Sequence, residues 1–409
     1  MADTTLSTAH MHIGPGRLGL GLVVAAGLEA GLDVHLVTRK ASSLPASARF
    51  KVLEKGDDGE KRVALPIVKV SKADTMEALP EEVQRLACHA PELLVTISAT
   101  TKGLEERQAF LLALAGSRAS SSSAATTVFI PCENDPGECY SDLKARLEEL
   151  GVECRDTMVN RLCPELHVDE ADGVHEVVVD EMAEWVIQGG TNHQLALRAL
   201  EALSYVEFVP DVRPYETRKR WLVNGAHLAL AILARARNIP SIDIAAAEPG
   251  RSEWLAKLQE ALIESLDQCH PEMAENHVYA ARHVAAWMRH EDNVSRILNR
   301  LRRENPLPFF DDLERKLIEP IAMLEDLSRF PQVHYVLDRL HRVLQRATSY
   351  ADYEKLQKIL PSLSTSIDVR TCARYQELLT PIIGTAEARK RADNLGVALE
   401  SHREAVQLF

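Results

Sequence analysis

The stretch Met11-His-Ile-Gly-Pro-Gly-Arg-Leu-Gly-Leu-Gly21 determines the fold prediction. A short apolar segment is followed by glycines 14, 16 and 19 and then by an apolar run that reaches Gly31. In a strand–turn–helix unit that binds a dinucleotide, Gly14 makes the tight turn, Gly16 lets the backbone approach the pyrophosphate, and Gly19 lets the helix pack against the strand. The free N–H groups at the helix start attract the anion. The predicted cofactor-binding residues of this turn are Gly14, Gly16, Arg17, Leu18 and Gly19.

Further apolar segments alternate with helical patterns in the first half of the chain. The predicted strands are Met11–Ile13, Asp33–Val37, Val63–Val70, Leu93–Ile97 and Thr127–Pro131, and one predicted helix is Leu104–Ala115. Strands separated by helices indicate parallel β-α-β units and therefore an α/β, Rossmann-type, doubly wound sheet. The polar segment that begins at Ser117 is typical of a solvated connecting loop.

The sequence changes character after Pro210. Apolar residues recur at helical spacing in five segments, and no strand pattern follows them. The segments are Leu222–Ala234, Glu253–Leu266, His277–His290, Val294–Arg303 and Leu313–Leu327. We therefore expect a dinucleotide-binding domain over residues 1–208 and a mainly α-helical substrate and catalytic domain over residues 209–409.

Composition excludes several classes of protein. The chain has 409 residues and a net charge of −13, whereas proteins that bind nucleic acids need a large basic face. The apolar run Leu18–Leu28 is too short to cross a bilayer, and the first residues lack the basic segment of a signal peptide. The seven cysteines are scattered and form no C-x-x-C pair. We expect a cytoplasmic protein with no nucleic-acid partner, no membrane partner and no metal.

The end of the second predicted strand bears on the choice of cofactor. An Asp or Glu at this position accepts hydrogen bonds from the adenosine ribose of NAD, but this chain has Thr38-Arg39-Lys40. Two cations without a carboxylate favour a 2′-phosphate, so the expected cofactor is NAD(P)(H), with NADP(H) preferred. A solvated basic loop is the alternative. The small residues Ser98 and Ala99, at the end of the fourth strand, suit the nicotinamide-side ribose.

A second informative stretch begins at Pro214 and contains Glu216, Lys219, Asn224 and His227. At roughly 100° per residue from Lys219, Glu216 falls at about 60°, His227 at about 80° and Asn224 at about 140°. The four residues therefore share one arc of a helix. The rest of the stretch is largely apolar, which indicates a buried helix. Polar groups on a buried helix are costly unless they face a polar cavity.

These residue types can carry out alcohol oxidation. A lysine can accept the hydroxyl proton if burial and neighbouring cations lower its pKa. An asparagine and a histidine can hydrogen-bond the same oxygen as it becomes an alkoxide or carbonyl. The alternative for each residue alone is structural: a lysine that extends to solvent and a core histidine bonded to the backbone.

The string P-Y-E-x-x-K-x-x-x-x-N-x-x-H is similar to the signature of the polyol-specific long-chain dehydrogenases, the mannitol dehydrogenase family. The resemblance implies a Rossmann-type domain joined to a helical domain and zinc-independent interconversion of a polyol (or its phosphate) with a ketose (or its phosphate). It implies that Lys219 is the general acid/base and that Asn224 and His227 hold the reacting oxygen. Glu216 is a candidate proton relay.

Other segments resemble blocks of the same family. Cys132-Glu133-Asn134 is similar to its C-[DE]-N and adds Glu133 and Asn134 to the cofactor-binding residues. The resemblance of the segments Asp156–Pro164 and Arg300–Pro306 adds Asp156, Asn160, Arg300 and Arg302 as substrate-binding residues. If the substrate carries a phosphate, its candidate ligands are Arg300, Arg302, Arg303, Arg315 and Lys316, and the alternative for each is a solvated basic face of a helix. Asn160 stands where the family usually has Asp. The glycine turn and the length are more similar to the mannitol-1-phosphate branch than to the longer polyol branch.

Two other functions remain open at this stage. A β-hydroxyacid dehydrogenase also joins a Rossmann domain to a helical domain with Lys and Asn, and a dinucleotide sensor could keep the fold without turnover. Tyr140 and Lys144 imitate the Y-x-x-x-K of short-chain dehydrogenases by chance. The expected partner is a small polyol or sugar phosphate, and the expected state is a monomer or homodimer.

Overall fold

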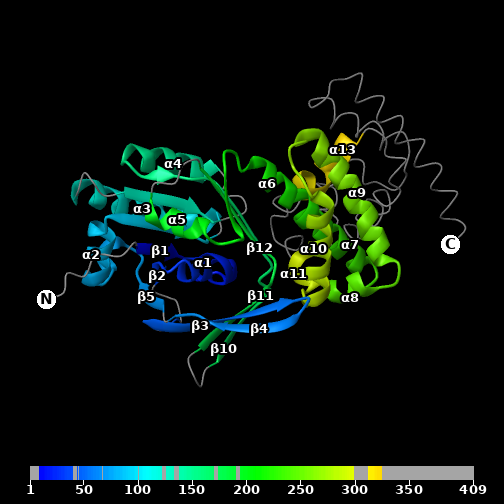
Figure 1. Cartoon of the computed structure of the whole chain (residues 1–409), viewed down its shortest axis with the longest axis horizontal. Coiled ribbons are helices and arrows are strands. Elements are labelled where there is room, and N and C mark those ends of the chain that lie inside the picture. Colours follow the sequence, from blue (N-terminus) through cyan, green and yellow to red (C-terminus); the bar gives the residue numbers. More distant parts are fainter. Residues whose placement is uncertain are drawn as a thin grey trace, which may run out of the picture. The chain divides into compact units, whose positions relative to one another are not determined.

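The computed structural model describes residues 9–39, 44, 46–66, 68–99, 101–121, 126–132, 138–169, 174–189, 194–298 and 312–324. Their contacts divide the chain into two compact units, Met1–Glu216 and Thr217–Phe409. Figure 1 shows the sheet of the first unit with its helices and, separately, the helices of the second unit.

The centre of the first unit is a parallel sheet with strand order β5-β2-β1-β6-β7-β8. This is the order of a doubly wound dinucleotide-binding fold, so the predicted α/β, Rossmann-type class is confirmed. The strands are β1 (Ala9–Ile13), β2 (Asp33–Thr38), β5 (Val68–Lys72), β6 (Glu92–Ile97), β7 (Thr126–Pro131) and β8 (Glu153–Cys154).

The sheet continues beyond β5 with strands that the sequence analysis missed. β3 (Ser47–Gly56) pairs antiparallel with β5 and with β4 (Gly59–Ala64), while β11 (Val174–Asp180) joins β3 in parallel and β10 (Glu165–Asp169) closes that edge. A second sheet has the order β13-β12-β9, formed by Val206–Val209, Ala183–Gln188 and Thr157–Arg161. The predicted strand Val63–Val70 is therefore wrong. Its first residues belong to the end of β4 and its last residues to the start of β5, and these are two separate strands.

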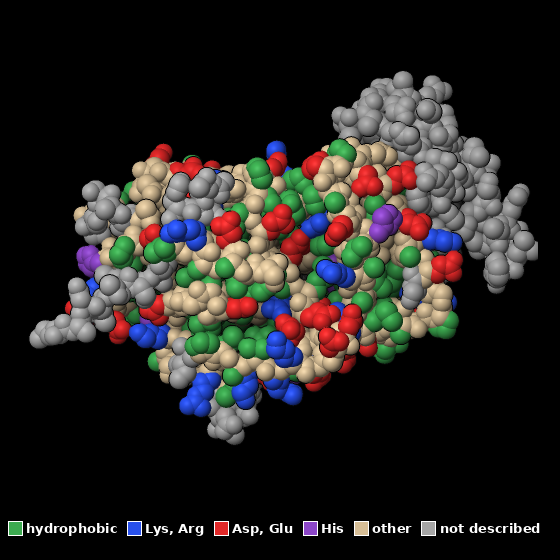
Figure 2. Space-filling model, viewed as in Figure 1, with side chains coloured by type: hydrophobic (Ala, Val, Ile, Leu, Met, Phe, Trp, Pro, Cys, Tyr) green, Lys and Arg blue, Asp and Glu red, His purple; other side chains and the backbone are tan. Residues whose placement is uncertain are grey.

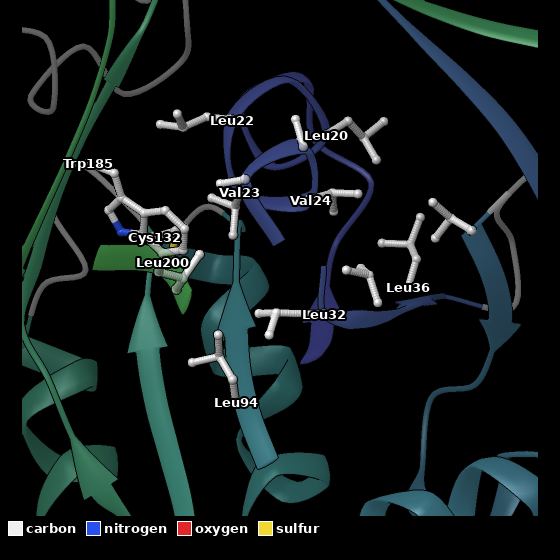
Figure 3. Packing of buried hydrophobic residues seen from close by; sticks show 14 of the residues in the cluster. Leu20, Leu22, Val23, Val24, Leu32, Leu36, Leu94, Cys132, Trp185 and Leu200 are labelled. Atoms are coloured by element: carbon white, nitrogen blue, oxygen red, sulfur yellow. The ribbon is translucent and has the colours of Figure 1, made fainter. Parts of the chain in front are cut away.

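Helices cover both faces of the parallel sheet, and the alternation of side chains along each strand assigns the faces. Met11, Val95 and Phe129 pack with α2 (Glu81–His89), α3 (Thr101–Ser121) and α4 (Glu138–Glu149). Leu94 and Val128 pack on the opposite face with η1 (Gly19–Val24), α1 (Ala25–Glu29) and α5 (Leu195–Glu201). In Figure 3, Leu22 and Val23 of η1 lie on the side of Trp185, and Leu20 and Val24 lie on the side of Leu36. A short 3₁₀ turn, η2 (Met76–Ala78), precedes α2.

The loop predicted from Ser117 is wrong for the described residues, because α3 continues to Ser121. Arg118 explains the difference. Its buried guanidinium donates hydrogen bonds to the Thr127 hydroxyl (2.5 Å) and to the carbonyls of Ala87 (2.7 Å), Ala90 (3.0 Å) and Thr126 (2.8 Å). The serine-rich sequence gives no sign of these hydrogen bonds of Arg118, because only the tertiary structure brings the accepting carbonyls together.

The second unit is helical in the residues that the structure describes there. It contains η3 (Lys219–Gly225), α7 (Ala226–Ala236), α8 (Ile242–Ala247), α9 (Arg251–Cys269), α10 (Asn276–Arg289), α11 (Val294–Leu298), η5 (Glu314–Ile318) and α13 (Glu319–Met323). α6 (Arg213–Arg218) leads into η3. These elements confirm the expected helical C-terminal part. Ser241 and Asn293 form an isolated antiparallel bridge there.

The surface seen in Figure 2 carries basic and acidic side chains interspersed with one another. Within the described ranges, no helix combines the length and hydropathy needed to cross a bilayer. The same ranges contain no cluster of three His, Cys, Asp or Glu side chains that could hold a metal ion.

Two histidines share one face of β1, a strand whose residues are all buried. His10 and His12 are fully buried, and the Thr96 hydroxyl lies 2.7 Å from His10 Nε2 and 2.7 Å from His12 Nδ1. Burial is the main reason why the pKa of each ring is lowered from 6.5 to about 3, and His12 further lowers the pKa of His10. Both rings are therefore neutral in the folded protein near pH 7.

We expect these two histidines to make stability depend on pH. Below pH 6.5 the unfolded chain binds a proton on each ring, whereas the folded chain does not until about pH 3, so stability is full above 6.5 and falls towards 3. The loss is about 1.4 kcal/mol per histidine for each pH unit in that window. Urea unfolding at about pH 7.5 and about pH 5.5 measures it, with about 3 kcal/mol expected from the pair.

His10→Gln should halve this contribution, and His277→Gln, which changes an exposed ring, should leave it unchanged. An unfolding free energy in the His10→Gln variant that falls as steeply with pH as in the wild type would contradict the assignment.

Candidate active site

The glycine turn after β1 is positioned by close backbone contacts. Gly14 has φ +106°, and its N–H donates to Val37 O at 3.0 Å. A Cβ at Gly14 would overlap the carbonyl oxygen of Ser98. A Cβ at Gly19 would lie 2.5 Å from His12 Nε2 and 2.8 Å from Ser98 Cβ. Both positions therefore require glycine.

Gly16, by contrast, is exposed, and its carbonyl accepts the first bond of the following helix from Leu20 N at 2.9 Å. The predicted residues Arg17 and Leu18 form the first helical turn after it. The guanidinium of Arg17 donates to the carbonyl of Pro164, which ties this turn to the segment after β9. An exposed glycine at the start of a helix, in front of a parallel sheet, suits a pyrophosphate.

The ends of β2 and β6 lie beside this turn, because both strands pair with β1. Thr38 is buried, whereas the Arg39 side chain is 70 % exposed and forms an ion pair with Glu106 at 3.4 Å. Ser98 is buried and its N–H donates to Ile13 O at 2.9 Å, while Ala99 is half-buried. The structure thus brings these four predicted residues to the same edge of the sheet as the glycine turn.

Asp156 and Asn160 lie elsewhere in the first unit. The Asp156 carboxylate accepts hydrogen bonds from Tyr140 Oη (3.1 Å) and Lys144 Nζ (3.0 Å to each oxygen). Tyr140 and Lys144 therefore both donate hydrogen bonds to the same half-buried carboxylate. Burial and the nearby Asp156 raise the pKa of Tyr140, which makes the phenol a poor proton donor. Asn160 is buried in β9.

The second unit begins with the other predicted group. Lys219 is the first residue of η3 and is only 7 % exposed, while Asn224 and His227 are half-buried. η3 is a π-helix, in which the N–H of residue i+5 bonds the carbonyl of residue i. Asn224, the fifth residue after Lys219, therefore lies one turn above it. The α-helical count that separated these two residues by about 140° is corrected by this wider turn.

His227 is held by two residues that the sequence analysis did not single out. Its ring stacks on Trp287 of α10, with centroids 5.2 Å apart and an interplanar angle of 28°. Its Nε2 lies 3.6 Å from Oδ2 of Asp292, which is 4 % exposed. A buried carboxylate near a helix is a weak signal in a sequence with 60 acidic residues, so pattern reasoning had no means of finding it.

Glu216 is a half-buried residue of α6, and the division between the two units falls directly after it. The predicted residues Glu133, Asn134, Arg300, Arg302 and Arg303 lie outside the described residues. Of the further phosphate ligands, Arg315 and Lys316 belong to η5. Lys316 Nζ lies 2.9 Å from Oδ1 of Asp312, and Arg315 Nη2 lies 3.9 Å from the same oxygen.

η5 is packed directly against η3. Trp221 Nε1 donates to Arg315 O at 3.1 Å, and a Cβ at Gly225 would overlap the carbonyl oxygen of Lys316. The π-helix that carries Lys219 and Asn224 therefore depends on a glycine at its end.

We expect Gly225→Ala to destabilise the protein by about 2 kcal/mol or more, because the methyl group must displace a backbone carbonyl. Gly116→Ala is the matched control, because nothing lies within 4 Å of a Cβ at that position. Alanine in the interior of α3 should increase the free energy of unfolding by at most about 1 kcal/mol. Urea unfolding of both variants measures the difference. Equal or greater stability for Gly225→Ala would refute the close packing of η5 on η3.

Comparison with known proteins gives relatives and fold neighbours. No family model matches the chain. The chain is 22 % identical over 365 residues to mannitol-1-phosphate 5-dehydrogenase of Shouchella clausii, covering 81 % of this chain and 87 % of that protein. It is 24 % identical over 339 residues to the protein of the same name from Paenarthrobacter aurescens, covering 78 % and 85 %.

Among solved structures, the fold is similar to mannitol 2-dehydrogenase of Pseudomonas fluorescens in its ternary complex with NAD and D-mannitol. The TM-score is 0.59 at 17 % identity, with 99 % of this chain and 93 % of that chain covered. A substrate-free D-sorbitol dehydrogenase gives a TM-score of 0.63 at 12 % identity, with 96 % and 95 % covered. The chain is thus similar in sequence to proteins named mannitol-1-phosphate 5-dehydrogenase and similar in fold to mannitol 2-dehydrogenase and D-sorbitol dehydrogenase.

Proposed function

We propose that this protein is an NAD(P)-dependent polyol dehydrogenase that interconverts a polyol phosphate and a ketose phosphate, of the mannitol 1-phosphate and fructose 6-phosphate type. The observation that carries the proposal is the arrangement of Lys219, Asn224 and His227 on one helix, with the lysine buried at the start of a π-helical turn. π-Helical turns are rare and are often found at functional sites. The relatives named mannitol-1-phosphate 5-dehydrogenase support the choice of substrate.

The residues of the first unit fit a dinucleotide. The backbone around the exposed Gly16 can approach a pyrophosphate, and Ser98 with Ala99 lies at the adjoining strand end. When bound, the nicotinamide would donate or accept the hydride. Among the proposed contacts, those of Glu133 and Asn134 rest on the resemblance of their segment alone.

NADP(H) is the proposed preference. Arg39 is largely exposed, and its ion pair with Glu106 is a surface pair at 3.4 Å. Such pairs contribute about 1 kcal/mol or less, so Arg39 can exchange Glu106 for a 2′-phosphate at little cost. Thr38 is buried and offers no carboxylate to a ribose hydroxyl.

The proposed chemistry follows from the three side chains. In the direction of oxidation, the neutral amine of Lys219 accepts the hydroxyl proton as the C–H bond releases its hydride. The Asn224 amide donates a hydrogen bond to the oxygen, whose negative charge grows as the proton leaves. His227 hydrogen-bonds the same oxygen, and Glu216 carries the proton onward to solvent. Reduction reverses each step, with Lys219 as the acid.

The substrate phosphate would be bound by basic residues. Arg315 and Lys316 share Asp312 and together carry one more positive than negative charge, which suits an anion. Arg300, Arg302, Asp156 and Asn160 remain proposed substrate ligands on the resemblance of their segments. The proposal includes a cytoplasmic location, supported by scattered cysteines without a C-x-x-C pair, and action as a monomer or homodimer.

The test combines substrates with a variant of the proposed base. The wild type should oxidise NADPH with fructose 6-phosphate much faster than with fructose at the same concentration. Lys219→Met should lower kcat by about 10³-fold or more, because acid–base catalysis is lost, and should leave the NADPH dissociation constant within about twofold. Arg235→Met, at the exposed end of α7, is the control and should retain full activity. Full turnover by Lys219→Met, or no reduction of either sugar, would refute the proposal.

Cofactor preference has its own test. Arg39→Ala should raise the KM for NADPH about tenfold and leave the KM for NADH nearly unchanged, since about 1.4 kcal/mol of binding to the 2′-phosphate is removed. Arg62→Ala, which removes another exposed ion pair at 3.3 Å, should alter neither value. An equal effect of Arg39→Ala on both cofactors would exclude Arg39 as the determinant of preference.

A further inference from the structure

The end of β2, the end of β5 and α3 are tied together at Ala73, the residue that follows β5. The Ala73 N–H donates to Thr38 O at 2.9 Å, and the Ala73 carbonyl accepts a hydrogen bond from Arg107 Nη1 at 2.7 Å. The Arg107 side chain is 7 % exposed, and its guanidinium carbon lies 5.9 Å from the centroid of the Phe110 ring. Because Arg107 belongs to α3, these two bonds hold α3 at a defined position relative to the end of β2.

An ion pair joins the residues next to these bonds. Arg39 follows Thr38, and Glu106 precedes Arg107. Arg39 Nη1 lies 3.4 Å from Glu106 Oε2, and their side chains are 70 % and 43 % exposed. Side chains of a helix lean toward its N-terminus, and the N-terminus of α3 follows the carboxyl end of β6. The Glu106 carboxylate therefore lies toward the carboxyl ends of the parallel strands, where β2 also ends.

The pair spans the point at which the order of the parallel strands reverses. β2 and β6 pair with opposite edges of β1, and the sheet continues with β5 on the side of β2 and with β7 on the side of β6. In doubly wound sheets a dinucleotide binds outside the carboxyl ends of the strands at this reversal, with the adenosine ribose at the end of the second strand. A ribose in that position would have Arg39 beside it from β2 and Glu106 beside it from α3.

The two side chains suit different cofactors. A guanidinium binds a phosphate through charge-assisted hydrogen bonds, so Arg39 favours the 2′-phosphate of NADP(H). An ionised carboxylate accepts a hydrogen bond from the 2′-hydroxyl of NAD(H) but repels a phosphate. Thr38 and Arg39 offer no carboxylate at the end of β2, and Glu106 supplies one from an element 67 positions after Arg39. Partners for both cofactors therefore lie around the same ribose position.

We propose that Glu106 is a specificity-determining residue for the cofactor: its carboxylate competes with a 2′-phosphate for Arg39 and accepts a hydrogen bond from the 2′-hydroxyl of NAD(H). The protein then accepts both dinucleotides, and Glu106 limits the preference for NADP(H). Because the ion pair is exposed, exchange of either partner costs little free energy. This inference rests on the dinucleotide binding of the proposed function and does not depend on the sugar or on Lys219.

Calorimetric titration of NADPH and of NADH in the absence of sugar tests the role. Glu106→Gln should lower the dissociation constant of NADPH by about three- to tenfold, because a negative charge beside the phosphate is removed and Arg39 is released. Glu106→Ala should do the same and should raise the dissociation constant of NADH by about fivefold, since the acceptor for the 2′-hydroxyl is lost. Glu105→Gln removes the same charge from the adjacent, exposed residue and should leave both constants within about twofold.

A double-mutant cycle shows whether Glu106 acts through Arg39. In the Arg39→Ala background, Glu106→Gln should lower the dissociation constant of NADPH by about twofold or less, because only the direct repulsion between carboxylate and phosphate remains. An undiminished effect in that background would overturn the competition for Arg39. The thermal midpoints of all these variants should match that of the wild type, because an exposed ion pair contributes little to stability.

The outcomes separate this proposal from the proposed function. An unchanged dissociation constant of NADPH in Glu106→Gln, or an equal change for NADPH and NADH, would overturn the role of Glu106, even in a protein that reduces fructose 6-phosphate. The expected changes in a protein that reduces no sugar would support the role of Glu106 and refute the proposed polyol reaction.

Discussion

Close backbone packing at glycines is the constraint on which both units depend. In the first unit the turn and the helix after β1 contact the sheet at Gly14, Gly19 and Gly27, where a Cβ would meet Ser98, His12 or His10. This approach allows a buried face with Leu20, Val23 and Val24 to form against the strands. The same packing buries two histidines, which costs desolvation free energy. This cost is limited because both rings are neutral and both lie within hydrogen-bond distance of the Thr96 hydroxyl.

The same constraint shapes the helix of the second unit. Gly225 admits the carbonyl of Lys316, and Trp221 bonds the preceding carbonyl, so η5 lies directly on η3. Both contacting segments are π-helical, and the extra residue in each turn brings Asn224 above Lys219. This departure from α-helical geometry is thus part of how the proposed acid/base and its hydrogen-bonding partner come together.

The sequence predicted the elements that have a strong local pattern. The glycine turn and the apolar strands β1, β2, β6 and β7 were found because buried parallel strands form near-continuous apolar runs. β4 was misassigned because every residue in it is exposed, so no alternation of apolar and polar residues marks it. The extent of α3 was missed because Arg118 is stabilised by three carbonyls from two other segments, the end of α2 and the start of β7, which no local pattern shows.

The fold class, the glycine turn and the Lys–Asn–His stretch are predictable from the residues alone, because each is defined by spacing along the chain and spacing is a local property. The side chains that surround those residues are known only from the folded chain. Asp292 lies 65 positions after His227 and Trp287 lies 60 positions after it. They meet His227 because α10 packs beside η3 and backbone bonds brace the turn that follows α10. Contacts between distant segments arise from packing, and the helical spacing of apolar residues would be the same in many sequences without Asp292 or Trp287.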